Sequence, residues 1–120
     1  MTGRATMRAT RLRLTTICGF LLPLVVAPAL AAEDPTFTLE FRDGAITPSR
    51  LEVPANTRFR LELKNSGKTP AEFESKELKK EKVLAAESDS VLVIRTLDPG
   101  EYPFFDDFHP DAPPAILVAK

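Results

Sequence analysis

The fold of this chain is decided by the stretch DPGEYPFFDDFHP, residues 98–110. Its Pro99-Gly100 pair is typical of a tight turn. The aromatic residues that follow alternate, so Tyr102 and Phe104 share one face of a predicted strand. Two carboxylates and the only histidine of the chain come next and predict a polar loop. After this loop, the apolar run Ala115–Ala119 predicts a final buried strand.

Most of the preceding sequence also predicts β-strands. Residues 36–42 alternate strictly, and residues 58–65 carry a charge at every other position, which leaves one face solvated. Residues 88–95 are apolar on both faces, which predicts a central strand. Turn signals recur roughly every eight to twelve residues, as they do in all-β sandwiches. The residues expected in the core between two sheets are Phe59, Leu61, Leu63, Phe73, Val93, Phe104 and Val118.

Two segments depart from this regular pattern. Residues 46–54 contain Pro48 and Pro54, which restricts them to the edge of a sheet. Residues 76–82 are almost all charged, and we expect them to form a short helical turn or a charged loop. With these exceptions the sequence predicts a sandwich of about seven to eight strands.

Residues 1–31 predict a secretory signal peptide. Four arginines and no acidic residue precede the apolar run at residues 17–27, and Ala29-Leu30-Ala31 is a small-x-small cleavage site. We expect cleavage after Ala31, which leaves residues 32–120 as one domain in the bacterial periplasm. A membrane anchor is the alternative, but its apolar run contains prolines and is shorter than the ~20 residues that a span needs.

Removal of the signal peptide makes the domain acidic and free of cysteine. Lys+Arg falls from 16 to 12 while Asp+Glu stays at 17, so the formal net charge changes from −1 to −5. An acidic domain is a poor binder of nucleic acid. Cys18 and both methionines leave with the signal peptide, so the domain has no disulfide and depends on its core alone.

The C-terminal stretch resembles the end of a cupredoxin, a small blue-copper protein with a Greek-key β-sandwich. In the amicyanin and plastocyanin type, Gly-x-Tyr precedes a copper-binding Cys, a His three residues later, a Met and an apolar strand. Here residues 100–102 match the opening and His109 matches the histidine, whereas Asp106 falls on the cysteine and Ala112 on the methionine. Because type 1 copper needs a thiolate, the substitution excludes a blue-copper centre.

Further segments resemble a subgroup, the EfeO-type cupredoxin-like proteins, which are encoded beside bacterial iron permeases. The resemblance lies in residues 72–78 and 81–83 and extends over nearly all of residues 32–120. It implies a metal-binding accessory of ferrous or ferric iron uptake. It also implies a partner, either a membrane iron permease complex or another periplasmic iron protein.

Carboxylates and one imidazole are the candidate metal ligands. Asp106, Asp107 and His109 lie close together in sequence, and such a set suits iron, manganese, or non-blue Cu(II) or Zn(II). Ala71 occupies the position of the first cupredoxin histidine, and Glu72 follows it. Strand alternation points Glu72 outward. It therefore reaches the position that corresponds to copper in cupredoxins only if the strand is bulged.

Glu77 and Glu81 extend this candidate set, because the cupredoxin topology places their segment nearby. Carboxylates that lie close together raise one another's pKa unless a cation neutralises them, which is a physical reason to expect a metal. Interpretations without a metal stay open. Asp106 and Asp107 could belong to a solvated loop, and His109 could pack against an aromatic ring. The Glu/Lys segment could be an ordinary solvent-exposed face.

Three functions therefore stay open. The first is the metal-binding accessory, with iron or non-blue copper bound through carboxylates and His109. The second is a copper- or iron-dependent ferroxidase or electron-transfer component. The third is a metal-free interaction module on a cupredoxin scaffold. We expect no catalytic residues among the protein groups, because the sequence contains neither a Ser-His-Asp arrangement nor a Gly-rich phosphate loop.

Overall fold

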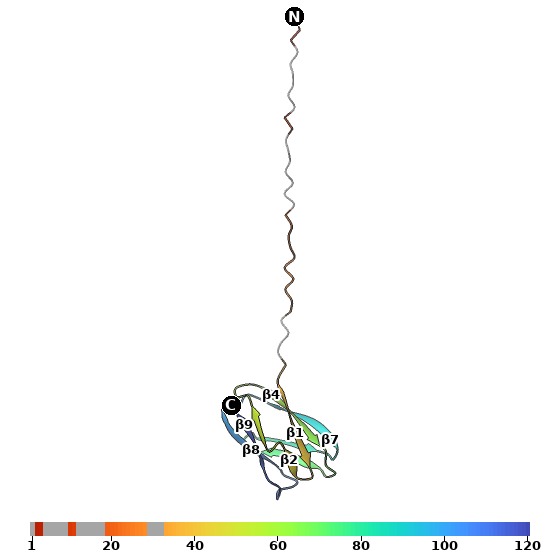
Figure 1. Cartoon of the computed structure of the whole chain (residues 1–120), viewed down its shortest axis with the longest axis vertical. Helices are drawn as coiled ribbons and strands as arrows, with labels where there is room; N and C mark the ends of the chain where they lie inside the picture. Colours follow the sequence, from red (N-terminus) through yellow and green to blue (C-terminus); the bar gives the residue numbers. More distant parts are fainter. Residues whose placement is uncertain (1, 4–9, 12–18, 29–32) are drawn as a thin grey trace. The chain divides into compact units, whose positions relative to one another are not determined.

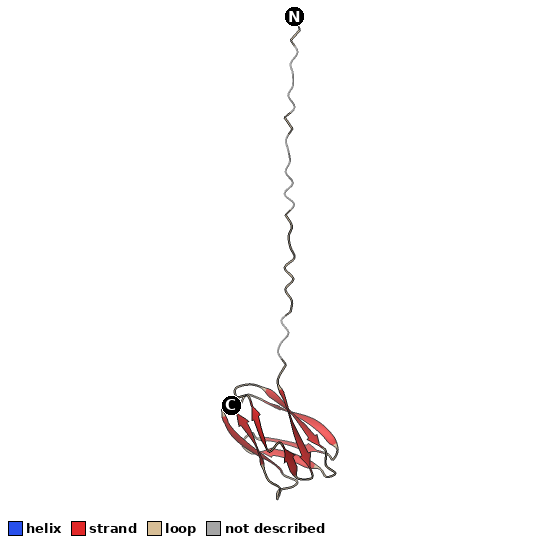
Figure 2. Cartoon of the chain, viewed as in Figure 1, coloured by secondary structure: helices blue, strands red, loops and turns tan. Residues whose placement is uncertain are grey.

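The computed structural model describes residues 2–3, 10–11, 19–28 and 33–120. The chain divides into two units, Met1–Leu30 and Ala31–Lys120. Among the described residues, all strands lie in the second unit and no helix occurs (Figure 2). Those residues accordingly include no helix long and apolar enough to cross a membrane. The predicted cleavage point after Ala31 lies outside the described residues.

Nine strands form two sheets that pack face to face (Figure 1). The strands are β1 (Thr36–Arg42), β2 (Ala45–Thr47), β3 (Arg50–Val53), β4 (Phe59–Asn65), β5 (Ala71–Ser75), β6 (Lys80–Leu84), β7 (Ser88–Ile94), β8 (Gly100–Asp106) and β9 (Ala115–Ala119). One sheet has the order β2-β1-β4-β7 and the other β3-β9-β8-β5-β6. The pairs β1–β4 and β3–β9 are parallel, and the other pairs are antiparallel. The predicted all-β sandwich is confirmed.

The charged segment supplies a strand that the sequence did not predict. Residues 76–79 form a turn, and β6 begins at Lys80 and pairs with β5, Ser75 opposite Lys80 and Ala71 opposite Leu84. Only Leu84 of this strand is buried. Backbone hydrogen bonds to β5 thus hold β6 in place, and its exposed lysines suit an edge strand because charges discourage pairing with other chains. Over residues 76–82 the sequence predicts a short helical turn or a charged loop. Residues 76–79 do form a turn, which is not helical, and the prediction is wrong from Lys80 onward.

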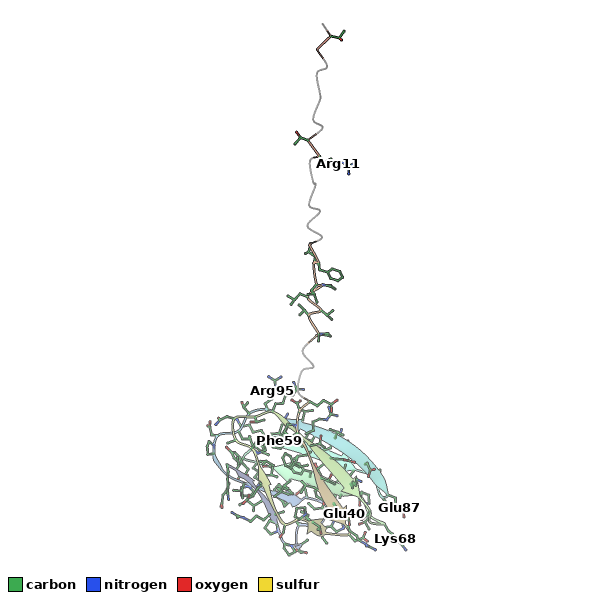
Figure 3. The ribbon with its side chains drawn as sticks, turned by 45° about the horizontal axis from the view of Figure 1, so that its top comes forward. Arg11, Glu40, Phe59, Lys68, Glu87 and Arg95 are labelled. Carbon is green, nitrogen blue, oxygen red and sulfur yellow. The ribbon has the colours of Figure 1, made fainter. Side chains whose placement is uncertain are left out.

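The core lies between the two sheets and is rich in phenylalanine. Strand β4 alternates as predicted, with Phe59, Leu61 and Leu63 fully buried. Figure 3 shows Phe59 inside the sandwich. On the other sheet, Phe73 of β5 stacks on Phe104 of β8, with ring centroids 4.9 Å apart. These five residues all belong to the core cluster, as predicted.

One of the other two core predictions needs correction. Val93 is half-buried, because the β4–β7 register puts Ile94 opposite Phe59 and Leu92 opposite Leu61. Side chains directly opposite in an antiparallel pair share a face, so Ile94 and Leu92 face the core. Strand β7 is an edge strand rather than a central one. Val118 is buried as predicted, at 5% exposed, although it lies outside the core cluster, on the face opposite Leu117.

Candidate functional site

Three loops meet at one end of the sandwich: the β1–β2 turn, the β4–β5 loop and the β8–β9 loop. The backbone N–H groups of Lys68 and Thr69 donate to Asp43 Oδ1, at 2.9 and 3.0 Å. A Cβ built on Gly44 would lie 3.4 Å from the Cβ of His109, so the first turn also contacts the third loop. Figure 3 labels Lys68 at this end of the domain and Arg95 at the other.

Asp106 is the buried centre of this end. It is the last residue of β8 and is 2% exposed, because alternation places it on the inward face with Phe104. Its Oδ1 accepts hydrogen bonds from the backbone N–H of Glu72 at 2.9 Å and of Phe108 at 3.1 Å. Its Oδ2 lies 2.8 Å from Nδ1 of His109. Both carboxylate oxygens therefore have protein partners.

His109 joins Asp106 to the other two loops. Its backbone N–H donates to the carbonyl of Asp106 at 3.0 Å, which closes a tight turn. On the far side of the ring, Nε2 lies 3.1 Å from Oγ1 of Thr69. The Thr69 hydroxyl in turn donates to Oδ1 of Asp43 at 2.8 Å. Asp106, His109, Thr69 and Asp43 thus form one hydrogen-bonded chain, here called the loop clasp.

Asp43 is the negatively charged outer end of the loop clasp. The hydrogen bond from the Thr69 hydroxyl is the main reason why the pKa of Asp43 lies below its ordinary value. The N–H groups of Thr69 and Lys68 lower this pKa further, as does His109 when its imidazole is protonated, whereas desolvation opposes the shift. Hydrogen bonds to the ionised form favour that form, so Asp43 is a carboxylate in the folded protein.

A second polar group lies beside the loop clasp, on the outer face of β5. One carboxylate oxygen from each of Glu72, Glu74 and Asp107 lies within 4.8 Å of the others, and we call these three residues the carboxylate cluster. Glu72 and Glu74 are two residues apart on β5 and so point to the same face. The N–H of Asp107 donates to the carbonyl of Glu72 at 3.0 Å, which fixes the third carboxylate next to the first.

The carboxylate cluster carries uncompensated negative charge. Desolvation is the largest cause of the raised pKa of Glu72, followed by the charges of Asp107, Glu81, Glu74 and Asp106. Desolvation also comes first among the causes that raise the pKa of Glu74, followed by Asp107 and Glu81, and only Lys76 opposes it. A cation placed among these side chains would relieve the repulsion.

The predicted ligands therefore fall into three locations. Asp106 and His109 lie in the loop clasp, and Asp107 and Glu72 lie in the carboxylate cluster, where Glu72 points outward and β5 is paired regularly with β6. Glu81 lies opposite Glu74 on β6 and adds to its repulsion. Glu77 lies at the other end of the domain, where it lines a pocket with Ile94 and Tyr102.

Three residues of these groups were not among the predicted ligands. Alternation already places Glu74 on the outward face with Glu72, in the segment expected near the site, but it was not selected as a ligand. Asp43 looks like an ordinary residue of an Asp-Gly turn, and Thr69 looks like a loop residue before a proline. No local pattern connects either of them to His109, because their contact depends on how the loops converge.

Comparisons with known proteins agree with this fold. The profile of the cupredoxin-like domain family matches residues 15–119. An uncharacterized protein of Rickettsia prowazekii (strain Madrid E) is 32% identical over 82 residues, which cover 68% of this chain and 66% of that protein, just under two thirds of its length.

Solved structures with the same fold share little sequence with this chain. A structure of auracyanin B has a TM-score of 0.60 at 16% identity and covers 75% of this chain and 93% of its own. The auracyanin of Roseiflexus castenholzii has a TM-score of 0.60 at 12% identity and covers 74% and 99%. A purple cupredoxin from Nitrosopumilus maritimus has a TM-score of 0.53 at 16% identity and covers 69% and 98%. At these identities the likeness concerns the fold alone.

Proposed function

Because this chain belongs to the cupredoxin-like domain family, we propose that it is a periplasmic metal-binding protein which holds a hard cation in its carboxylate cluster. The proposal is carried by one observation. Oxygens of Glu72, Glu74 and Asp107 converge within 4.8 Å on the outer face of β5. The raised pKa values of Glu72 and Glu74 support it in part: desolvation is their largest cause, but repulsion from the neighbouring carboxylates comes next, and a cation would remove that repulsion.

Copper of the blue type does not fit the residues of this chain. Two of the four positions that correspond to cupredoxin ligands are Ala71 and Ala112, which have no donor atom. The other two, Asp106 and His109, are hydrogen-bonded directly to one another. The cupredoxin relatives named above therefore give the fold but no ligand set, and we place the metal on the neighbouring outer face.

The chemistry of the carboxylate cluster favours hard ions. Carboxylate oxygens suit Fe(II), Fe(III), Mn(II) and similar cations, whereas soft Cu(I) prefers thiolate or thioether ligands. Among the described residues, no ion pair engages Glu72, Glu74 or Asp107. Their partly exposed side chains leave room for water to complete the coordination of an ion, as hard cations commonly require.

We further propose an accessory role in bacterial iron uptake. Support comes from the resemblance of residues 72–78 and 81–83 to EfeO-type proteins, a stretch that contains two members of the carboxylate cluster. The predicted signal peptide supports a periplasmic location. In this role the domain would pass iron to a membrane permease complex or to another periplasmic iron protein.

Calorimetric titration tests the metal site. Fe(II) under anaerobic conditions, Mn(II), Cu(II) and Zn(II) are each added to the protein and to the triple variant Glu72→Gln, Glu74→Gln, Asp107→Asn. We expect one hard ion to bind to the wild type with a Kd below about 1 mM, and at least about tenfold more weakly to the variant.

The control variant removes the same number of charges elsewhere on the domain: Glu40→Gln, Glu87→Gln and Asp89→Asn, all exposed. It is expected to bind as the wild type does. Equal loss in both variants would indicate only a general effect of net charge. If no ion binds to the wild type below the millimolar range, the metal-free interaction module becomes the better interpretation.

A further inference from the structure

We infer that the loop end of this sandwich, where a cupredoxin carries its copper, is closed by side chains alone, with His109 as a double hydrogen-bond donor between Asp106 and Thr69. The loop clasp would then hold the three loops together without a metal ion, and His109 would not be a metal ligand. This inference does not rest on metal binding by the carboxylate cluster, which involves other side chains.

The hydrogen atoms at Thr69 determine the role of His109 Nε2. The Thr69 hydroxyl has one hydrogen, and it lies on the line to Oδ1 of Asp43, 2.8 Å away, because a carboxylate only accepts. A contact of 3.1 Å between Thr69 Oγ1 and Nε2 then requires Nε2 to supply the hydrogen. His109 Nε2 is therefore an N–H donor, and its lone pair is not free for a metal.

The other ring nitrogen is engaged as well. Nδ1 lies 2.8 Å from Oδ2 of Asp106, a carboxylate whose Oδ1 already accepts two backbone N–H groups. Metal–ligand bonds to nitrogen and oxygen are about 2.0–2.2 Å long, so an ion held tetrahedrally by both atoms would keep them roughly 3.3–3.6 Å apart. The observed distance fits a direct hydrogen bond instead.

The positions of Thr69 and Asp43 are fixed independently of His109. Asn65 is 2% exposed, and its side-chain amide donates to the carbonyls of Thr69 and Ala85, at 2.9 and 3.1 Å. A Cβ on Gly67 would lie 2.7 Å from the backbone nitrogen of Asp43, so only glycine permits this approach of the β4–β5 loop to the β1–β2 turn. The acceptor oxygen for Nε2 thus lies on a loop that is held by contacts other than the one with the imidazole.

The first experiment is nitrogen NMR of the ¹⁵N-histidine-labelled protein, secreted from the full chain, with Zn(II) as the probe. His109 is the only histidine, so its ring signals are unambiguous. We expect Nε2 to show a directly bonded hydrogen, and both ring shifts to stay constant with a tenfold excess of Zn(II). A bare Nε2, or a Zn(II)-dependent shift typical of ligation, would overturn the inference.

The second experiment uses thermal unfolding of the same protein with and without EDTA. We expect the chelator to leave the wild-type Tm unchanged, and Thr69→Val to lower it by roughly 4–8 °C, the shift that accompanies the loss of one typical hydrogen bond. The matched control is Thr57→Val, which removes a local hydrogen bond from the Thr57 hydroxyl to the carbonyl of Ala55, two residues away. A wild-type Tm that EDTA lowers, or equal effects of the two valine variants, would contradict the clasp.

Discussion

Nδ1 of His109 lies 2.8 Å from Oδ2 of Asp106, and the two residues are three positions apart on the loop that follows β8. The Asp106 side chain is 1% exposed and that of His109 is 25% exposed. The same spacing brings a cysteine and a histidine to copper in the cupredoxins that the sequence resembles. Here it brings two side chains to each other.

Replacing Asp106 with alanine should destabilise the fold by about 3–5 kcal/mol, as expected when one partner of a buried, hydrogen-bonded pair is removed. The substitution leaves the N–H groups of Glu72 and Phe108 and the ring of His109 without their acceptor. Urea unfolding followed by circular dichroism measures the difference. The exposed neighbour Asp111 provides the control, since Asp111→Asn should change stability by less than about 0.5 kcal/mol. Similar values for the two variants would contradict the importance of the buried carboxylate.

Leu61→Ala should cost about 2–5 kcal/mol, because it removes a fully buried side chain from the core between the sheets. Val93→Ala should cost less than about 1 kcal/mol, because Val93 is half-buried on the outer face of β7. Both variants are compared by chemical denaturation at one pH. A Val93 variant as unstable as the Leu61 variant would show that the β4–β7 register is shifted by one residue, since such a slip exchanges the two faces.

Asp43 should make the stability of the domain depend on pH at the acid end. Its pKa is lowered in the folded protein, chiefly by the hydrogen bond from Thr69. A group with a lowered folded pKa stabilises the fold above its unfolded pKa, about 3.9, and this contribution is lost as the pH falls through the folded value. The gap in urea midpoint between wild type and Asp43→Asn should therefore be constant near neutral pH and shrink below about pH 4. A difference in urea midpoint that increases below about pH 4 would contradict a lowered pKa of Asp43 in the folded protein.

The protein loaded with Cu(II) should remain free of the intense colour of blue-copper proteins. That colour requires a cysteine thiolate as ligand, and residues 32–120 contain no cysteine. An absorption spectrum of the protein with one equivalent of Cu(II) checks this, with an authentic cupredoxin as the positive control. An intense blue band would mean that the assignment of copper-ligand positions to Ala71, Asp106, His109 and Ala112 is wrong.

Much of the fold follows from local sequence patterns. The sequence pattern predicted most of the strands and most of the core. Its signals were the alternation in β1 and β4, the inward phenylalanines of β5 and β8, and the turn pair Pro99-Gly100. These signals are local because successive side chains of a strand point to opposite faces, so inward and outward residues can be read from a period of two. The same period shows why Glu72 points outward and shares a face with Glu74.

Other features depend on partners that are distant in sequence. Strand β6 is almost entirely exposed, so only its hydrogen bonds to β5 make it a strand. Strand β7 is apolar on both faces, and only its register with β4 decides that Leu92 and Ile94 are inward and Val93 outward. For a strand with both faces apolar, a period of two cannot select the face.

Some features of the candidate site likewise follow from local sequence, and others depend on tertiary packing. The sequence by itself determined that residues 32–120 contain no cysteine and that Asp106 and His109 are three residues apart. It also determined that two glutamates share a face of β5. Tertiary structure alone decided that Thr69, 40 residues before His109, contacts its imidazole, and that Asp43, a further 26 residues back, completes the loop clasp. The physical reason is that a hydrogen bond between loops depends on the packing of the whole sandwich, whereas the face of a strand depends only on its own backbone.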